Sequence, residues 1–272
     1  MMKRTAKFFL YLQLLIGRLG VFLLGPLIFI AIKLIGYRVR DLRKIRGNVL
    51  NLFEKHNGPW VICPNHLTMI DSAVLAYAMA PLHRYMLNYR LLPWNLPERA
   101  NFQSNIFLAV LCYLAKCLPI SRGGNRKKMK ATMDKCAYLL NQKESLLIFP
   151  EGGRSRTSRV DTENFSYGVG RLINNNPDCN VMCIYLRGDG QDKYSNIPRF
   201  GERFTMRIEA FQPRTESTGL KGQRECAKQI VEQLAQMEKD YFGRQRYCRS
   251  DRFPDKREKP GYAVHEQSVH TG

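Results

Sequence analysis

The sequence predicts an α/β fold in which helices flank a mainly parallel central sheet, with an N-terminal hydrophobic helix pair that anchors the chain to a membrane. Short apolar stretches, several of them ended by a proline or a polar turn, alternate with segments whose apolar residues recur at helical spacing. This alternation is typical of parallel sheets, because helices join their strands. We expect three parts: a membrane anchor of two interfacial helices at 1–46, a globular domain at 47–243, and a basic, disordered tail at 244–272.

The 272-residue chain is strongly basic, with 43 Lys+Arg against 23 Asp+Glu and a net charge of +20. Such an excess attracts polyanions, whether nucleic acid, an anionic membrane surface or phosphorylated substrates. A hydrophobic content of 44% is enough to build a core and excludes global disorder. The eight cysteines are scattered, with no C-x-x-C pair and no histidine at metal-ligand spacing. This pattern indicates reduced thiols in a cytosol-facing protein and no metal site.

The N-terminal apolar region at 8–35 predicts the membrane anchor. Its longest uncharged piece, 19–32, would span about 21 Å as a helix at roughly 1.5 Å per residue, whereas a bilayer core is about 30 Å thick. Pro26 falls inside this piece and would kink or break a helix. Basic residues flank both ends, which favours a hairpin that dips into one leaflet. The alternative is one tilted span in which Arg18 and Lys33 reach the interface.

The later elements follow from their local patterns. Residues 60–63 are apolar β formers ended by Pro64. Residues 223–242 carry apolar side chains at helical spacing, which predicts an amphipathic helix. By the same reasoning, we expect helices at 48–55, 69–80, 106–115, 127–141 and 223–242, and strands at 60–63, 84–87, 145–149, 181–186 and 204–210.

His66 lies in the polar turn after the strand at 60–63, and Asp71 follows five residues later, where the next helix begins. Five residues is not same-face spacing on a continuous helix, so the two side chains meet only if His66 lies in the turn and Asp71 in the first helical turn. The carboxylate would then hold the imidazole in one tautomer and leave its other nitrogen free to take a proton. The alternative is a capped helix start with an incidental histidine.

A second polar turn contains Arg122 and two glycines, and it precedes the helix expected at 127–141. Glycines let the backbone approach a ligand closely, and a helix start offers free N–H groups to an anion. The guanidinium of Arg122 is suited to phosphate. The turn therefore indicates a phosphate site, with a solvated basic loop as the alternative.

A third polar turn follows the strand at 145–149 and carries Glu151, Gly152 and Arg154. In a parallel sheet, ligands gather at the carboxyl ends of the strands. We therefore expect this turn to share one edge of the sheet with the turns that hold His66 and Arg122.

These three turns, in this order and spacing, resemble the motifs of the glycerolipid acyltransferases typified by 1-acylglycerol-3-phosphate acyltransferase. An N-H-x-x-x-x-D block is matched from Asn65 to Asp71, with Thr68 where serine is usual. A second block ends in an arginine matched by Arg122, and an F-P-E-G-x-R-S block is matched at 149–155. The resemblance covers roughly residues 50 to 190, and its first and third blocks are specific.

Two positions depart from the family pattern. Gly153 stands where threonine is common, and Met182 stands where a fourth block usually has proline. Both departures bear on the identity of the acyl acceptor, while the reaction class is unaffected.

The resemblance implies transfer of an acyl chain from acyl-CoA or acyl carrier protein to the free hydroxyl of 1-acylglycerol 3-phosphate, which gives phosphatidic acid. In this reaction His66 is the general base, Asp71 orients it, and neither a metal nor another cofactor takes part. Arg122 and Arg154 would hold the acceptor phosphate, and Glu151 would hold its glycerol hydroxyl. The substrate-binding residues implied are Asn65, Thr68, Arg122, Glu151, Gly152 and Arg154. The resemblance also implies a lysophospholipid acceptor and a catalytic domain on the cytoplasmic face of the inner membrane.

Several alternatives stay open at this point. The acceptor could be an ornithine-type lipid, a glycolipid or a specialised lipid, or the fold could serve as a non-catalytic scaffold. A covalent acyl-cysteine route through Cys63 is another alternative, although its apolar strand indicates an inert, buried thiol. A nucleic-acid-binding module would explain the charge, but basic side chains interleaved with aromatics on a recognition surface are not found, so we expect no nucleic-acid partner.

Overall fold

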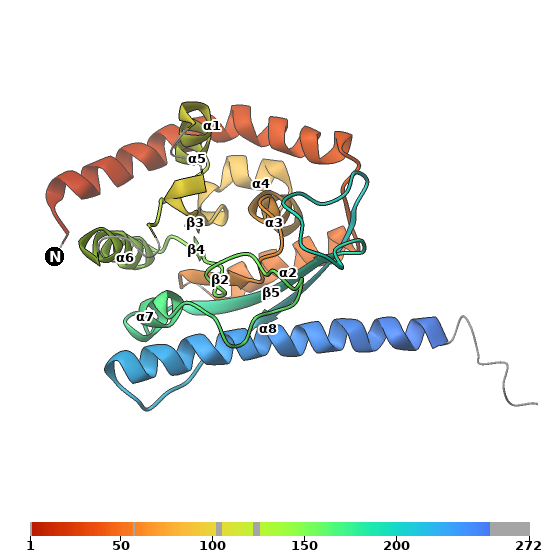
Figure 1. The fold of residues 1–272 in the computed structure, drawn as a ribbon. Coiled ribbons are helices and arrows are strands. Elements are labelled where there is room, and N and C mark those ends of the chain that lie inside the picture. The colour runs from red at the N-terminus through yellow and green to blue at the C-terminus, as the bar shows by residue number, and fades with distance from the viewer. Residues whose placement is uncertain (1, 57, 102–104, 122–125, 251–272) are drawn as a thin grey trace, which may run out of the picture. The chain divides into compact units, whose positions relative to one another are not determined.

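The computed structural model describes residues 2–56, 58–101, 105–121 and 126–250 (Figure 1). The chain divides into two compact units, Met1–Glu238 and Lys239–Gly272. The sheet and the candidate site belong to the first unit. The N-terminal segment expected to be a separate anchor belongs to this unit as well.

The elements alternate between helices and short strands along the chain. The helices are α1 (Arg4–Leu34), α2 (Leu42–Lys55), α3 (Asp71–Met79), α4 (Leu82–Leu87), α5 (Ile106–Leu114), α6 (Arg126–Asn141), α7 (Gly168–Asn174) and α8 (Gly219–Ser250), with 3₁₀ turns η1 (Tyr89–Leu91) and η2 (Arg99–Asn101). The strands are β1 (Arg38–Val39), β2 (Trp60–Pro64), β3 (Trp94–Asn95), β4 (Leu146–Leu147), β5 (Asn180–Gly188) and β6 (Arg203–Ala210).

The strands form one sheet in the order β1-β6-β5-β2-β4-β3. Strands β5, β2, β4 and β3 are parallel to one another, β1 is parallel to β6, and β6 runs antiparallel to β5. The predicted α/β fold with a mainly parallel sheet and flanking helices is therefore confirmed. The parallel run matters for the site, because it brings the carboxyl ends of β4, β2 and β5 to one edge.

Strand β5 shows how the two faces of the sheet are covered. Because side chains alternate along a strand, Met182, Ile184 and Leu186 point into one apolar core, which they share with residues of α2 and α3. Tyr185 points to the opposite face, where its hydroxyl lies 3.2 Å from a carboxylate oxygen of Glu238 in α8. Strand β5 is thus covered on both faces, which agrees with its nearly continuous run of buried residues.

Helix α1 is one continuous helix, not the predicted hairpin of two helices, although Pro26 lies inside it. It runs past α4 and α5 (Figure 1). A Cβ atom placed on Gly25 would lie 2.5 Å from Cδ1 of Leu82 in α4, so the two helices approach closely at the predicted break. The amide of Gln13 donates hydrogen bonds of 3.0 Å to the carbonyls of Tyr113 and Cys117. This packing along α1 offsets the roughly 3 kcal/mol that an interior proline costs a helix.

The segment predicted as a strand at 84–87 is helical and forms α4. Helical spacing buries Tyr85, whose hydroxyl donates to the carbonyl of Ala76 at 2.7 Å, and exposes Leu87. A short apolar run does not by itself distinguish strand from helix, and here the tertiary contact of Tyr85 decides. Helix α8 likewise continues to Ser250, past the boundary predicted at 243/244. Residues 251–272 of the predicted tail lie outside the described residues.

One buried ion pair braces the segment between η1 and β4. The side chain of Lys116 is fully buried, and its Nζ donates to Oε2 of Glu144 at 2.8 Å and to the carbonyls of Tyr89 and Leu92 at 3.1 and 2.9 Å. Burial lowers the pKa of Lys116, and the neighbouring carboxylate opposes this shift. The positive charge of Lys116 has no access to water, so the carboxylate of Glu144 is needed to compensate it.

Candidate active site

Three loops meet at the carboxyl edge of the parallel strands. They follow β2, β4 and β5, which are neighbours in the sheet. Backbone hydrogen bonds tie them together: the amide of Ser155 donates to the carbonyl of His66, and the amide of Met69 donates to the carbonyl of Asn196, both at 2.9 Å. The predicted meeting of the first and third turns at one edge is therefore found.

His66 and Asp71 face each other as the spacing predicts. Helix α3 begins at Asp71, and His66 lies in the turn before it. Nδ1 of His66 is 3.0 Å from Oδ2 of Asp71. This contact leaves Nε2 as the nitrogen that is available to a substrate hydroxyl. The His66 side chain is 17% exposed, whereas that of Asp71 is almost completely buried.

Asp71 is fixed by more than the histidine. Its Oδ2 also accepts hydrogen bonds from the backbone amides of Leu67 at 2.7 Å and Thr68 at 2.8 Å, and its Oδ1 accepts from the Thr68 hydroxyl at 2.5 Å. These bonds fold the turn around the carboxylate and give two buried amides of the turn before α3 their acceptor. Thr68, which stands in place of the family's usual serine, supplies the same hydroxyl.

Asn65 joins the His66 turn to the neighbouring strand. Its side-chain amide donates to the carbonyl of Leu186 at 3.0 Å, and its carbonyl oxygen accepts from the amide of Leu186 at 2.7 Å. The backbone amide of Asn65 donates to the carbonyl of Ile184 at 3.1 Å. Asn65 is buried, so its structural task here is to extend the β2–β5 pairing by one residue and set the position of His66.

Phe149 and Glu151 support His66 from the loop after β4. The rings of Phe149 and His66 stack, with centroids 3.9 Å apart and an interplanar angle of 20°. Oε1 of Glu151 accepts from the backbone amide of His66 at 2.8 Å, and Oε2 accepts from the amide of Asp161 at 3.3 Å. Burial raises the pKa of Glu151 to about 8, while these two amides oppose the shift.

Gly152 and Arg154 complete the loop after β4. Gly152 has a φ of +70°, which glycine adopts without strain, and its amide closes a turn on the carbonyl of Phe149 at 3.1 Å. Arg154 donates through Nη1 to Oδ1 of Asn196, and its guanidinium carbon lies 5.3 Å from the ring centroid of Tyr194. Arg154 is thereby held by residues of the loop after β5.

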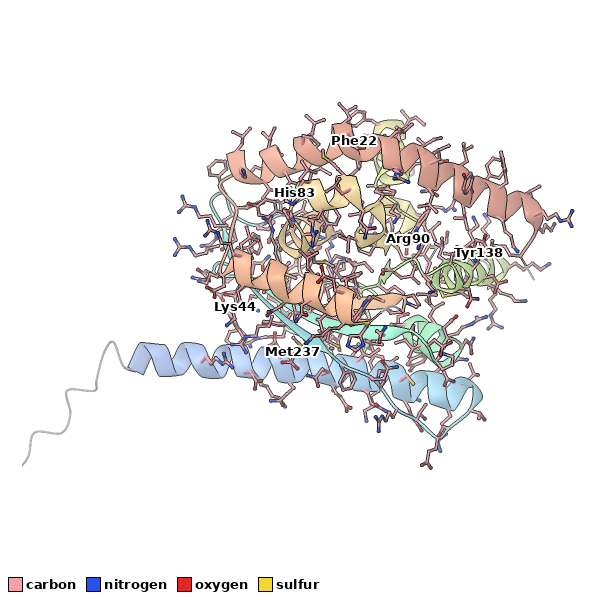
Figure 2. The ribbon with its side chains drawn as sticks, turned by 180° about the vertical axis from the view of Figure 1, so that it is seen from behind. Phe22, Lys44, His83, Arg90, Tyr138 and Met237 are labelled. Atoms are coloured by element: carbon pink, nitrogen blue, oxygen red, sulfur yellow. The ribbon has the colours of Figure 1, made fainter. Side chains whose placement is uncertain are left out.

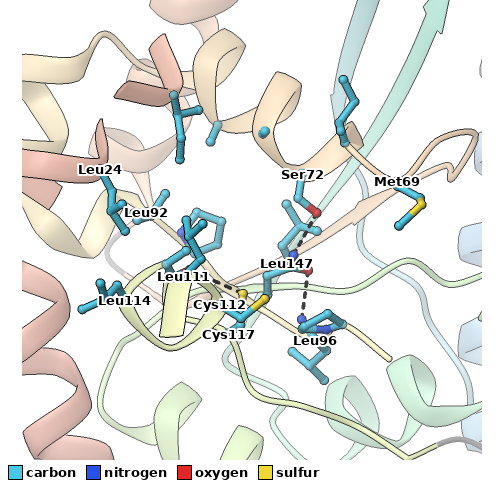
Figure 3. Close-up of a pocket in the computed structure, with 18 of the residues that line it drawn as sticks. Leu24, Met69, Ser72, Leu92, Leu96, Leu111, Cys112, Leu114, Cys117 and Leu147 are labelled. Atoms are coloured by element: carbon cyan, nitrogen blue, oxygen red, sulfur yellow. Dashed lines mark hydrogen bonds between the residues drawn. The ribbon is translucent and has the colours of Figure 1, made fainter. Parts of the chain in front are cut away.

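His66 and Arg154 both line a cavity of about 500 Å³. The other lining groups are mainly apolar side chains from α1, α3, α4 and α5; Leu24, Leu111 and Leu114 are among those shown in Figure 3. Ser72 and Asn95 are polar members of the wall and bond to each other at 2.8 Å. A volume in this range is typical of ligand pockets, which lie at about 300–1,000 Å³. The imidazole of His66 and the guanidinium of Arg154 therefore lie at the wall of one mainly apolar cavity.

The structure thus gathers most of the residues that the sequence singles out. His66, Asp71, Glu151 and Arg154 meet, with Asn65, Thr68 and Gly152 supporting the turns. Arg122 lies outside the described residues. Sequence reasoning missed Phe149 as a stacking partner and missed Tyr194 and Asn196 altogether. The signal for the last two was their position after the predicted strand at 181–186, because that strand ends at the same edge.

The geometry bears on the alternative covalent route through Cys63. Cys63 is fully buried in β2, and burial raises the pKa of its thiol well above the ordinary value, so it has the properties of an inert core thiol. Among the described residues, no group of three or more His, Cys, Asp or Glu side chains is placed to hold a metal ion.

The comparisons with known proteins assign the family. The model of the Acyltransferase family matches residues 38–187, more than half of the chain, so this protein belongs to the Acyltransferase family. The resemblance seen in the sequence is thereby confirmed, and the protein is an acyltransferase, with an acyl donor and an acyl acceptor as its substrates.

Among solved structures, the chain is similar to the 1-acyl-sn-glycerophosphate (LPA) acyltransferase PlsC from Thermotoga maritima. The two are 14% identical, with a TM-score of 0.40, and the match covers 82% of this chain and 97% of that chain. No curated protein matches the sequence.

Proposed function

We propose that this acyltransferase moves an acyl chain from acyl-CoA or acyl carrier protein to the free hydroxyl of 1-acylglycerol 3-phosphate, giving phosphatidic acid. The observation that carries the proposal is the His66–Asp71 pair, 3.0 Å apart, at an apolar cavity that Arg154 also lines. The cavity suits a long acyl chain, the histidine suits deprotonation of a hydroxyl, and the arginine suits a phosphate.

The chemistry needs the protein only for proton transfer and positioning. Nε2 of His66 takes the proton of the acceptor hydroxyl while its oxygen attacks the thioester carbonyl. The carboxylate of Asp71 stabilises the imidazolium that forms. When the tetrahedral intermediate collapses, the carbon–sulfur bond breaks, and the imidazolium returns its proton to the departing thiolate. The products are an ester and a free thiol, and His66 is ready for the next cycle.

The supporting residues divide into two groups. Arg154 binds the acceptor phosphate, and Arg122 is its expected partner in that role. Glu151 bonds to the His66 backbone amide, so in this proposal it positions the general base. Because each of its oxygens can accept more than one hydrogen bond, Glu151 can also receive the glycerol hydroxyl.

We further propose that α1 and α5 lie against a membrane, with the catalytic residues on the cytoplasmic side. Helix α1 is long and apolar enough to cross a membrane by length and composition. Large apolar side chains remain exposed on both helices, and Phe22 points away from the domain (Figure 2). The exposed apolar residues are Phe8, Phe9, Tyr11, Leu15, Leu19, Phe22, Leu23, Leu27, Ile30 and Leu34 on α1 and Ile106, Phe107, Leu108, Val110 and Tyr113 on α5. A surface of this kind marks an interaction site, and the net charge of +20 favours anionic lipid.

Acyl transfer by the detergent-purified full chain tests the function directly. Acyl-CoA and acyl carrier protein are offered separately as donors, and lysophosphatidic acid is the acceptor. His66→Ala is the test variant, and His83→Ala is the matched control, because His83 is an exposed histidine on α4. We expect phosphatidic acid from wild type and from His83→Ala, and a loss of about 10²–10⁴-fold in kcat for His66→Ala, the range typical of general-base removal.

Two outcomes would count against the proposal. Near-normal rates for His66→Ala would remove the histidine from the chemistry. Absence of transfer to lysophosphatidic acid, together with His66-dependent transfer to an ornithine-type lipid or a glycolipid, would retain the mechanism and replace the acceptor.

A further inference from the structure

The loop after β5, residues 189–202, forms one side of the site, although none of its residues belongs to the sequence motifs. Asn196 connects this loop to the site: its backbone carbonyl accepts from Met69 beside the His66 turn at 2.9 Å, and its side-chain oxygen accepts from Arg154. The hydroxyl of Tyr194 donates to the same Asn196 oxygen at 3.2 Å. Asn196 therefore joins the histidine turn through its backbone carbonyl, and Arg154 and Tyr194 through its side-chain oxygen.

Tyr194 brings a second guanidinium to the same place. The guanidinium carbon of Arg156 lies 4.5 Å from the Tyr194 ring centroid, and that of Arg154 lies 5.3 Å from it. Both distances are within the range of a cation–π contact, which is about 6 Å. Arg156 is exposed, so without the ring its long side chain would sample many conformations. One ring therefore contacts both guanidinium groups.

Arg187 anchors the loop after β5 by hydrogen bonds. Arg187, at the end of β5, is almost completely buried and donates to the carbonyl of Ser158 at 2.6 Å and to the carbonyl of Gln191 at 2.7 Å. These bonds tie the loop after β4 to the loop after β5. Tyr194 and Asn196 therefore belong to a loop that is held in place by hydrogen bonds, as residues that position a binding group must be.

Among the residues that the structure describes, no carboxylate is given as a partner of Arg154 or Arg156. The partners that the structure gives Arg154 are an amide oxygen and an aromatic ring, which are neutral. Asp71 is engaged with His66, and burial raises the pKa of Glu151 to about 8. Guanidinium forks pair well with phosphate oxygens, and stacked, hydrogen-bonded side chains lose less entropy when they bind.

We propose that Tyr194 and Asn196 are positioning residues that orient Arg154 and Arg156 as a two-guanidinium site for the phosphate of the acceptor. The inference rests on the proposed function and deepens it, because two fixed guanidiniums favour a phosphate monoester over a zwitterionic or uncharged head group. Tyr194 supplies the platform, Asn196 sets the direction of Arg154, and Arg156 adds the second charge.

The first test separates acceptor binding from chemistry by steady-state kinetics with lysophosphatidic acid. The variants are Asn196→Ala, Arg156→Gln and Tyr194→Ala, with Tyr194→Phe as the conservative variant that keeps the ring. Lys193→Gln is the matched control, because Lys193 is an exposed cation of the same loop. We expect the acceptor KM to rise about 10- to 100-fold in the three test variants, the range for loss of a charge-assisted contact. The donor KM and the control should stay within about twofold, and Tyr194→Phe should recover most of the affinity.

The second test does not depend on catalysis. Glycerol 3-phosphate is titrated calorimetrically into full-length His66→Ala protein and into the same protein carrying Arg156→Gln or Asn196→Ala, with glycerol as the uncharged control. Weaker binding of glycerol 3-phosphate in both double variants supports the site, even if wild type transfers nothing to lysophosphatidic acid and the proposed function fails. Unchanged binding, or acceptor KM values within twofold of wild type for Asn196→Ala and Arg156→Gln, would overturn the inference.

Discussion

The substitution Asp71→Asn tests whether the negative charge of Asp71 contributes to catalysis. Oδ2 of Asp71 accepts three of the four hydrogen bonds, from Nδ1 of His66 and from the amides of Leu67 and Thr68. Oδ1 meets the Thr68 hydroxyl, which can donate or accept. An asparagine whose carbonyl oxygen replaces Oδ2 and whose NH₂ replaces Oδ1 therefore keeps all four bonds and the same histidine tautomer. The substitution removes the negative charge and little else.

The magnitude follows from the distance. A unit charge pair separated by 3.0 Å attracts by about 5.5 kcal/mol at an effective dielectric constant of about 20, which is an upper bound for the lost stabilisation of the imidazolium. The difference between a charged and a neutral hydrogen bond, about 1.5 kcal/mol, is a lower bound. At about 1.36 kcal/mol per tenfold change, we expect kcat to fall by about 10- to 10⁴-fold.

The assay is acyl transfer with saturating donor and acceptor, run beside thermal unfolding of the same preparations. Asp71→Asn should unfold near the wild-type temperature. Asp71→Ala should lose more activity and also unfold earlier, because two buried amides lose their acceptor at about 1–3 kcal/mol each. If Asp71→Asn works within threefold of wild type while His66→Ala is inactive, the charge of Asp71 has no part in catalysis and the reasoning is wrong.

Three further predictions concern stability, each measured by thermal or urea unfolding. The pKa of Glu151 in the folded chain, about 8, lies above its ordinary value of 4.5. The free energy of unfolding should therefore fall as pH rises from about 4.5 to about 8, by up to about 1.4 kcal/mol per pH unit. The same pH dependence of stability in Glu151→Gln would contradict this prediction. Glu144→Gln should cost about 3–5 kcal/mol because it leaves a buried ammonium uncompensated, whereas Glu54→Gln, at an exposed ion pair, should cost less than about 1 kcal/mol. Gly170→Ala should destabilise by several times the effect of ordinary surface changes, because its methyl group would overlap the backbone of α8. Gly47 lies in the interior of the α2 sequence, and a Cβ atom there would meet no neighbour within 4 Å. Gly47→Ala should therefore stabilise the protein by about 0.5–1 kcal/mol.

The sequence allowed the centre of the site to be predicted because its logic is local. His66 and Asp71 are five residues apart, and one turn followed by one helix start is enough to bring them together. The edge shared with Glu151 followed from the general rule that parallel strands end on the same side. Family motifs then supplied roles that spacing alone left open.

What escaped prediction depends on contacts between distant segments. The helical state of α4 is decided by the burial of Tyr85, and the continuity of α1 through Pro26 by its packing against α4 and α5. Tyr194 and Asn196 have no motif of their own, so only the neighbourhood of β2 and β5 in the sheet reveals them. Such information is absent from local periodicity.

Helix α1 lines the cavity from Val21 to Phe29 and is bonded to α5 through Gln13. Deleting residues 1–34 to obtain a water-soluble fragment would therefore open the cavity on one side and remove the hydrogen bonds from Gln13 that hold α5. Such a fragment would retain His66, Asp71 and Arg154 and still be unable to enclose a fatty chain. An inactive truncated preparation would then say nothing about the chemistry, and purification strategies for this protein should keep its N-terminus intact.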